Sequence, residues 1–493
     1  MTLSRNYKFA VAGVVAVWLV SMGALVWQDR SGPRSPGIPS GEAMGTVSGI
    51  SPTGDEYMGA YLENERVGWV KTSSMRVGNG WTLNQESELK LTVQGQVRTI
   101  ETVGTADTDR DFRLRAFSFR LTTEGSALSA YGKVEDDTLA VTVDLGEGKK
   151  EIRFPLKKDI LVDLNVDRYL AAKGLKPGDR FEIEVFDPQT LGTVPVKVQV
   201  VGTERMTVMG FDVYATHLRR TLGGATFDAW IDANGKSLKE QGPLGLTLVR
   251  EAPADARKVV SRPGRDLIAK ASIAVNTAIP EPEARKSVTL KLHGVDLSPY
   301  QLASWRQKVS GDDLTISRDD LDALPKTSLP VTDPAFSEFL KPATLIESDN
   351  PEMARAAREA LAGEGMLPAA ALKLNEWLFA KLKKKNVVGV PDALTSLKSM
   401  EGDCNEHAFL YVAMARAAGI PARVAVGTAY LGGRFYYHAW PEVWAGGWIA
   451  LDPTWGQAPA DATHVRFIAD DVSRFADIIG LIGNLKIEVI SWD

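Results

Sequence analysis

Residues 402–455 read GDCNEHAFLYVAMARAAGIPARVAVGTAYLGGRFYYHAWPEVWAGGWIALDPTW. The stretch contains Cys404, the only cysteine of the 493-residue chain, followed by His438 and then by Asp452. A thiol, an imidazole and a carboxylate are the three groups of a cysteine-nucleophile site, in which the base activates the thiol and the acid orients the base. The stretch is therefore the candidate active site, provided that the fold brings these side chains together.

The candidate nucleophile begins a predicted helix. Asp403 is a good N-cap residue, and Glu406 three positions later completes the spacing of a capping box. An apolar face follows, Gly419 is a natural stop, and Pro421 prevents continuation. Cys404 is then the first helical residue, where unpaired N–H groups and the positive end of the helix dipole are expected to lower the thiol pKa.

Two predicted strands, 435–445 and 448–453, carry the imidazole and the carboxylate. A two-residue Gly-Gly turn would place His438 and Asp452 on opposite faces. A three-residue loop, 445–447, would pair Trp440 with Asp452 and put His438 diagonally beside it. The longer loop is favoured because one face of the hairpin then carries a coherent apolar set: Ala439, Pro441, Val443, Ile449 and Leu451. The sequence thus predicts that His438 and Asp452 are neighbours.

In this arrangement His438 is the predicted base, or the imidazolium of an ion pair with the thiol. Asp452 is predicted to fix the imidazole tautomer and to stabilise its positive charge. His407 lies near the helix face of Cys404 and is a rival base or a supporting residue. We prefer His438, because Asp452 can orient it.

Three further residues are placed around the site: Trp440 as a cleft wall, and Asp403 and Glu442 beside the triad or in the substrate cleft. A metal site made by Cys404, His407 and His438 is conceivable, but C-x-x-H without a second paired motif is a weak zinc signal. No metal and no organic cofactor are predicted.

The whole chain adds limits on compartment and partners. Its net charge is −5, and no long basic block points to nucleic acid. Residues 9–27 carry no charge and would make about 28 Å of helix, close to the thickness of a bilayer core. They predict an uncleaved single-pass inner-membrane anchor, with the main body periplasmic or extracellular.

The predicted fold class is a multidomain chain with an N-terminal transmembrane helix, a β-rich antiparallel barrel or sandwich, and a C-terminal α+β domain. Five segments are expected: a membrane anchor at 1–28, a flexible linker at 29–56, a β-rich scaffold or binding domain at 57–250, a connector at 251–345 and a catalytic domain at 346–493. In the β-rich segment the apolar parity changes between Ala116 and Phe117, which predicts a bulge or a change of partner face. This segment is also the candidate surface for a protein partner.

The stretches GDCNEHAFLYVAMARAAGIPARV, HAW with EVW, and GGWIALDPTW resemble the transglutaminase-like superfamily, a branch of the papain-like fold. The resemblance covers residues 385–470. Its nucleophilic Cys, the His of HAW and the Asp of LDPT fall on Cys404, His438 and Asp452. Residues 226–240, TFDAWIDANGKSLKE, look like the amino-terminal part of some bacterial membrane-anchored members, though less specifically.

The resemblance implies acyl transfer through a thioester: attack on a peptide or isopeptide amide, then resolution by water or by an amine. The backbone N–H of Cys404 is a plausible oxyanion donor. Two alternatives stay open. One is a non-catalytic binding or assembly protein that uses the fold as a docking module. The other is an acetyltransferase with the same triad.

Overall fold

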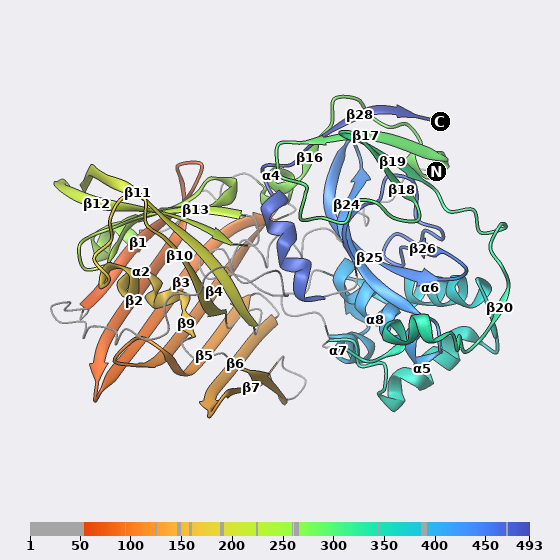
Figure 1. Ribbon diagram of the computed structural model, residues 1–493, viewed down its shortest axis with the longest axis horizontal. Coiled ribbons are helices and arrows are strands. Elements are labelled where there is room, and N and C mark those ends of the chain that lie inside the picture. Colours follow the sequence, from red (N-terminus) through yellow and green to blue (C-terminus); the bar gives the residue numbers. More distant parts are fainter. Residues whose placement is uncertain are drawn as a thin grey trace. The chain divides into compact units, whose positions relative to one another are not determined.

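The computed structural model describes residues 54–493, with gaps at 94, 124–125, 145–148, 157–159, 188–191, 223–224, 259, 261–265, 344, 386–391 and 470–471. These residues form two compact units, whose described parts lie within 54–266 and 267–493. The first unit consists mainly of strands, and the second combines strands with a group of helices (Figure 1).

The predicted transmembrane helix and the inner-membrane location drawn from it need correction. Crossing a bilayer takes about 20 consecutive apolar helical residues. The longest helix among the described residues, α8 (Cys404–Ala417), has 14 residues, and no described helix is long and apolar enough to span a membrane. Residues 9–27 lie outside the described residues, as does the linker at 29–56 except for 54–56. We therefore withdraw both predictions.

The first unit is one sheet of fifteen strands, which is antiparallel except between β9 and β10. Its strands are β1 (Gly54–Leu62), β2 (Glu65–Val77), β3 (Gly80–Val93), β4 (Gln96–Asp109), β5 (Leu114–Thr123), β6 (Ser126–Glu135), β7 (Thr138–Asp144), β8 (Lys149–Pro155), β9 (Leu161–Val162), β10 (Arg180–Asp187), β11 (Gly192–Val208), β12 (Phe211–Leu222), β13 (Ala225–Ile231), β14 (Ser237–Gln241) and β15 (Leu246–Arg250). Strand β1 pairs with both β2 and β15, so the first and last strands of the sheet in the sequence are neighbours. The edges of the sheet are β8 and β9.

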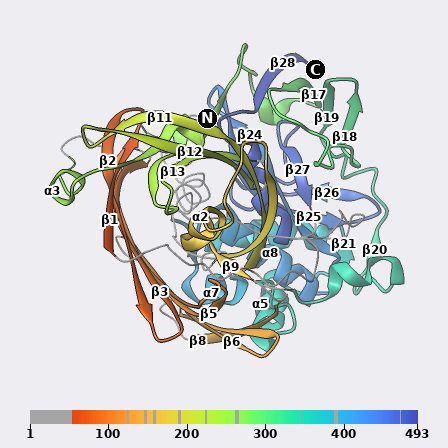
Figure 2. The same cartoon turned by 60° about the vertical axis from the view of Figure 1, so that its left-hand side comes forward.

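The described part of this unit also contains short helices: α2 (Asp163–Ala171), η3 (Pro243–Gly245) and α3 (Pro253–Ala256). Figure 2 shows the sheet curling around α2, which packs against β3, β9 and β10. The predicted bulge is present, because Asp107 pairs with Ala116 while Thr108 pairs with Leu114 and leaves Arg115 as the extra residue. The β-rich character of this part of the chain is thus as predicted.

The second unit begins before the predicted connector ends. Its elements are α4 (Leu267–Ala271), β16 (Ile273–Ala274), η4 (Pro282–Ala284), β17 (Ser287–His293), β18 (Gln307–Ser310), β19 (Asp313–Ser317), β20 (Thr327–Ser328), η5 (Pro334–Leu340), α5 (Pro351–Leu361), β21 (Met366–Leu367), α6 (Ala369–Lys381), β22 (Lys383–Lys384), α7 (Ala393–Ser399), β23 (Glu401–Gly402), α8, β24 (Ala422–Leu431), β25 (Arg434–Trp444), β26 (Trp448–Ala450), β27 (Val465–Ala469), η6 (Val472–Leu481) and β28 (Lys486–Trp492).

Two sheets organise this unit. One has the order β16-β25-β24-β27, with β26 paired to β25, and the other has the order β18-β19-β17-β28. Strand β17 pairs with β28 at the far end of the chain. Segments within 267–345 therefore complete both sheets of the same unit that contains the candidate site.

Helix α8 lies at the centre of the unit. It packs against β24 and β25 on the sheet side and against α5, α6 and α7 among the helices. A helix surrounded in this way needs apolar side chains on every face, and α8 is buried along nearly its whole length. The interior position of α8 therefore fixes where its first residue, Cys404, lies.

Candidate active site

The N-terminus of α8 is built as the sequence predicts. The Asp403 side chain accepts a hydrogen bond from the Asn405 N–H at 2.9 Å, and Glu406 accepts one from the Asp403 N–H at 2.8 Å. This is a complete capping box. A Cβ on Gly402 would lie 2.3 Å from that of Glu406, so glycine is needed immediately before the cap. Cys404 is thereby held as the first helical residue.

The thiol of Cys404 is completely buried. Burial raises its pKa well above the usual value, and the nearby charges of Asp403, Glu406 and Asp452 act in the same direction. A hydrogen bond with the backbone of Ala439 lowers the pKa, but it does not offset burial. The expected activation by the helix N-terminus alone is therefore wrong in direction, because desolvation dominates.

The hairpin of β25 and β26 has the register of the three-residue loop. Trp444 pairs with Trp448 and Glu442 with Ala450, so residues 445–447 form the connection. The ladder stops before Asp452, which makes an isolated bridge with Gln457 instead. Even so, Nε2 of His438 lies 2.9 Å from Oδ2 of Asp452, and both side chains are buried. The predicted neighbours are in direct contact.

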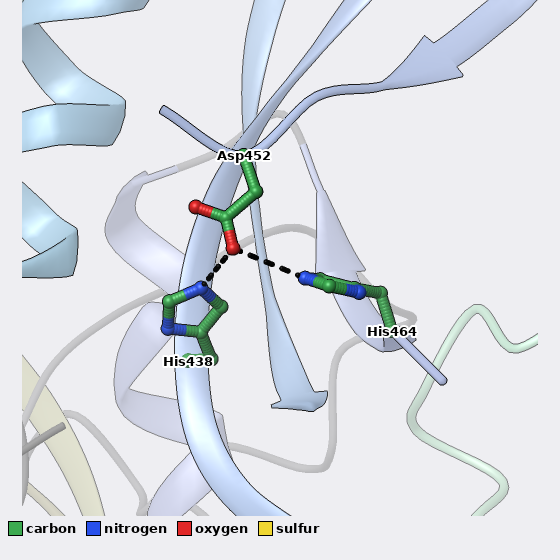
Figure 3. Close-up of side chains that lie close together, drawn as sticks. All are labelled: His438, Asp452 and His464. Carbon is green, nitrogen blue, oxygen red and sulfur yellow. Dashed lines mark hydrogen bonds and ion pairs between the residues drawn. The ribbon is translucent and has the colours of Figure 1, made fainter. Parts of the chain in front are cut away.

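Asp452 is surrounded by hydrogen-bond donors. Its Oδ1 accepts from the backbone N–H groups of Thr454 at 2.8 Å and Trp455 at 3.0 Å. Its Oδ2 accepts from both His438 and His464 (Figure 3). Burial opposes ionisation, but the charge of His438 and these hydrogen bonds hold the pKa of Asp452 far below its usual range. Asp452 is thus a carboxylate with fixed orientation.

His464 is the residue that the sequence analysis missed. It lies just before β27, and its Nε2 is 3.2 Å from Oδ2 of Asp452 while its Nδ1 is 3.1 Å from Oδ1 of Asp461. Burial works against its positive charge, but Asp461 and Asp452 raise the pKa of His464 to about 9. The only signal in the sequence is its place in DATH, shortly after LDPTW.

The side-chain atoms that His438, Asp452 and His464 could offer as metal ligands lie within 4.8 Å of one another, a spacing that could hold a metal ion. Oδ2 of Asp452 already accepts a hydrogen bond from each imidazole. A cation at this point would have to displace both hydrogen bonds. The present geometry is that of a hydrogen-bonded chain.

His407 is held by its own helix. Its Nδ1 lies 2.6 Å from the carbonyl oxygen of Asp403, and its Nε2 has no hydrogen-bond partner among the described residues. Burial lowers the pKa of His407 to about 4. The ring is neutral near pH 7, with Nδ1–H donating to the carbonyl. A backbone acceptor, and not a carboxylate, orients this histidine.

The two remaining predicted residues, Trp440 and Glu442, have different surroundings. The Trp440 ring lies 6.1 Å from the His438 ring, and its indole N–H is unpartnered within the described part of the chain. Glu442 instead accepts hydrogen bonds from Arg423 at 2.8 Å and from Arg466 at 3.1 Å. This buried ion network joins β24, β25 and β27.

Trp455 and Lys384 also lie beside the site. The Trp455 ring stacks on the His438 ring at 4.5 Å. Lys384 pairs with Gly402 across β22 and β23, and its Nζ is 4.3 Å from the centre of the Phe379 ring. Burial lowers the pKa of Lys384, while the charge of Asp452 opposes that shift. The Trp455 ring and the Lys384 side chain therefore lie beside the triad.

Known proteins match the second unit most clearly. The family model of the transglutaminase-like superfamily matches residues 354–453. A protein-glutamine gamma-glutamyltransferase of Pseudomonas aeruginosa is 40% identical over 85 residues, which cover 14% of this chain and 12% of that protein. The chain thus spans about an eighth of that relative.

Two solved structures match parts of this chain at low sequence identity. A candidate cysteine protease from Cytophaga hutchinsonii covers 42% of this chain and 86% of its own, at 15% identity and a TM-score of 0.28. A beta-barrel-like protein with a domain of unknown function from Brucella abortus covers 40% of this chain and 93% of its own, at 15% identity and a TM-score of 0.32.

Proposed function

This chain belongs to the transglutaminase-like superfamily of papain-like cysteine enzymes through residues 354–453, and from that premise we propose that it attacks peptide or isopeptide amides with Cys404. The reaction passes through a thioester and ends with hydrolysis or with transfer to an amine. His438 is the general base, and Asp452 orients it. No metal or organic cofactor has a role in this proposal.

One observation carries the proposal. Nε2 of His438 is engaged by Asp452, while Nδ1 is buried and has no hydrogen-bond partner among the residues described. The backbone of Ala439, the residue that follows His438 on β25, lies near enough to the Cys404 thiol to lower its pKa. A base with one nitrogen oriented and the other free, next to a thiol, is the arrangement that nucleophilic catalysis requires.

The proposed chemistry conserves every proton. Sγ of Cys404 attacks the amide carbonyl carbon while Nδ1 of His438 takes the thiol proton. The C–N bond then breaks, His438 gives this proton to the leaving nitrogen, and an acyl thioester remains on Cys404. Water or an amine, deprotonated by His438, attacks the thioester carbonyl, and Sγ leaves and regains a proton.

The raised pKa of Cys404 favours the general-base form of this mechanism over a resting ion pair. Ionising a buried thiol without a partner is costly, so proton transfer to His438 is best coupled to attack. The backbone N–H of Cys404, at the start of α8, is the proposed oxyanion donor.

The first substrates to test are chosen from the activity in the name of the Pseudomonas aeruginosa relative. That relative is a protein-glutamine gamma-glutamyltransferase, so a glutamine side chain is the first amide to test and a primary amine is the first acceptor. Peptide bonds are the second group of substrates. The two differ in the leaving nitrogen, which is ammonia for glutamine and a peptide amine for a peptide bond.

A second candidate is a docking module with an idle triad. The observation that favours it is the complete burial of Cys404 and Asp452 and the near-complete burial of His438. A substrate amide can reach Sγ only if the surrounding residues open. The two candidates make different predictions for any assay that detects acyl transfer to or from Cys404.

The deciding assay uses a glutamine-containing peptide with a fluorescent primary amine. Transamidation attaches the amine to the peptide, whereas hydrolysis releases ammonia and converts glutamine to glutamate. We expect one of these products with the wild-type protein and none with Cys404→Ala. Equal product from both proteins, or none from a panel of glutamine and peptide amides, would favour the docking module.

A further inference from the structure

We infer that His464 is a positioning residue of the same site, which together with Asp461 holds Asp452 in the orientation that His438 requires. The inference rests on the proposed function of Cys404, His438 and Asp452, and it extends that function to a chain of four groups: Asp461, His464, Asp452 and His438. Figure 3 shows the central part of this chain, with His438 and His464 meeting on one oxygen of Asp452.

The hydrogen bonds define how many protons His464 carries. Its Nδ1 faces Oδ1 of Asp461 at 3.1 Å, and its Nε2 faces Oδ2 of Asp452 at 3.2 Å. An ionised carboxylate can only accept hydrogen bonds, so each ring nitrogen must donate one. An imidazole that donates from both nitrogens is an imidazolium. His464 is thus a cation between two anions, in a fully buried position.

Asp461 is anchored strongly enough to hold that cation. Its Oδ1 accepts from the N–H and the hydroxyl of Thr463 at 2.8 and 2.6 Å, and its Oδ2 accepts from Nε2 of Gln457 at 2.9 Å. Gln457 also exchanges two backbone hydrogen bonds with Asp452, at 2.8 and 2.9 Å. The loop 452–464 therefore binds the two carboxylates and His464 into one connected structure.

Other titratable and charged groups face His464 from neighbouring elements. The His438 ring on β25 lies 5.7 Å away, and the rings of Trp440 and Trp455 lie at 5.2 and 5.4 Å. Arg306 donates to the carbonyl oxygens of Ala460 and Asp461. The charge of Asp452 also acts on His407 and Lys384 and raises the pKa of each, against the effect of burial. Asp461 and Asp452 are the two anions in direct contact with the ring.

The consequence for the reaction is electrostatic and geometric. Without His464, Oδ2 of Asp452 loses one of its two imidazole donors and the carboxylate can rotate about its side-chain bond. A rotated carboxylate no longer fixes the orientation of the His438 ring and of its unpartnered Nδ1. His464 thus acts through Asp452 and does not touch the reacting atoms.

The first readout does not depend on turnover. In an NMR titration of the folded wild-type protein, the His464 imidazole should remain protonated at pH 8, where an ordinary histidine is neutral. Asp461→Asn should make that proton easier to lose, because it removes the second anion. A His464 ring that is neutral at pH 7 in the wild type would overturn the inference, whatever the fate of the proposed function.

The second readout is alkylation of Cys404 by iodoacetamide across pH, measured for each folded variant. We expect His464→Gln to slow alkylation at pH 7 by about tenfold and to change the shape of its pH profile, with a smaller effect for Asp461→Asn. His293→Gln, at a half-exposed histidine on β17, is the matched control and should match the wild type. If His464→Gln is folded and alkylates like the wild type, the positioning role is wrong.

The failures of the two proposals differ. If Cys404→Ala makes as much product as the wild type, the proposed function fails while the titration of His464 stays informative about the chain of four groups. If the wild type forms product through Cys404 but His464→Gln keeps the turnover number and pH profile, only the present inference fails. If His464→Gln does not fold, Asp461→Asn and the wild-type titration still decide the inference.

Discussion

Nε2 of His438 donates a hydrogen bond to Oδ2 of Asp452 at 2.9 Å, although the pairing of β25 with β26 ends at Ala450, two residues before Asp452. The contact does not arise from regular strand pairing. Asp452 is turned toward His438 by backbone donors from Thr454 and Trp455 and by His464. The orientation of the candidate base therefore depends on the turn after β26 as much as on the sheet.

Asp452→Asn should abolish most activity without unfolding the protein. The amide is close in size, but it carries no charge and can stabilise the wrong imidazole tautomer of His438. We expect the rate of product formation to fall by about a hundredfold or more, measured as turnover of the glutamine peptide. Turnover within a fewfold of the wild type would show that Asp452 does not orient the base.

Glu442→Gln tests whether Glu442, a carboxylate on the same strand as His438, stabilises the fold and has no role in the site. Glu442 is buried and binds Arg423 and Arg466, so the amide leaves two buried guanidinium groups without their anion. We expect the free energy of unfolding to fall by about 3 kcal/mol in urea titrations. Alkylation of Cys404 per folded molecule should be unchanged, and a large loss there would place Glu442 in the site.

Gly402→Ala should disturb the nucleophile through its helix cap. The added Cβ would lie 2.3 Å from Cβ of Glu406 and 3.1 Å from its Oε2, which accepts from the Asp403 N–H. Relieving this clash breaks the capping box and shifts Cys404. We expect a loss of about 1 kcal/mol of stability and slower alkylation of Cys404. Gly202→Ala, at a strand glycine of β11 where an added Cβ has open space, should keep the alkylation rate.

The stability of the fold should fall as the pH rises from 6.5 to 9. The folded protein raises the pKa of His464 from 6.5 to about 9 and so keeps a proton that the unfolded chain releases. This stabilisation is complete below pH 6.5 and is lost as the pH passes 9. It amounts to about 3 kcal/mol at about 1.4 kcal/mol for each pH unit.

Urea titrations of wild type and His464→Gln across this range measure the effect. The free energy of unfolding should decline with pH in the wild type and more weakly in the variant. On the acid side the sign reverses, because Asp452 and Asp461 have pKa values below their usual range. Their contribution is present above about pH 4 and is lost as the pH falls further. Parallel curves for the two proteins between pH 6.5 and 9 would contradict the charge assigned to His464.

Local patterns in the sequence predicted the parts of the site that local physics determines. The capping box follows from Asp403 and Glu406 three residues apart, and the hairpin register follows from which parity gives one apolar face. Both features depend on neighbours within one or two elements. For the same reason the bulge near Leu114 was predictable from the change in apolar alternation.

The missed features depend on long-range packing. His464 returns to Asp452 through an irregular loop, which no periodicity describes. Glu442 was placed near the cleft because the predicted hairpin puts it on the same face as His438. Its partner Arg466 lies on β27, which is not part of that hairpin. The pKa of Cys404 was expected to fall because the helix N-terminus is visible in the sequence, whereas the complete burial of the thiol is not.

The most direct test of the central claim is to trap the acyl group on Cys404. Wild-type protein is mixed with the glutamine peptide, quenched in acid within the first turnover, digested and analysed by mass spectrometry. We predict a thioester adduct on the peptide that contains Cys404, formed at least about a hundredfold more slowly in His438→Ala and absent in Cys404→Ala. Product formation without any adduct on Cys404, or an adduct that forms equally fast in His438→Ala, would contradict this account.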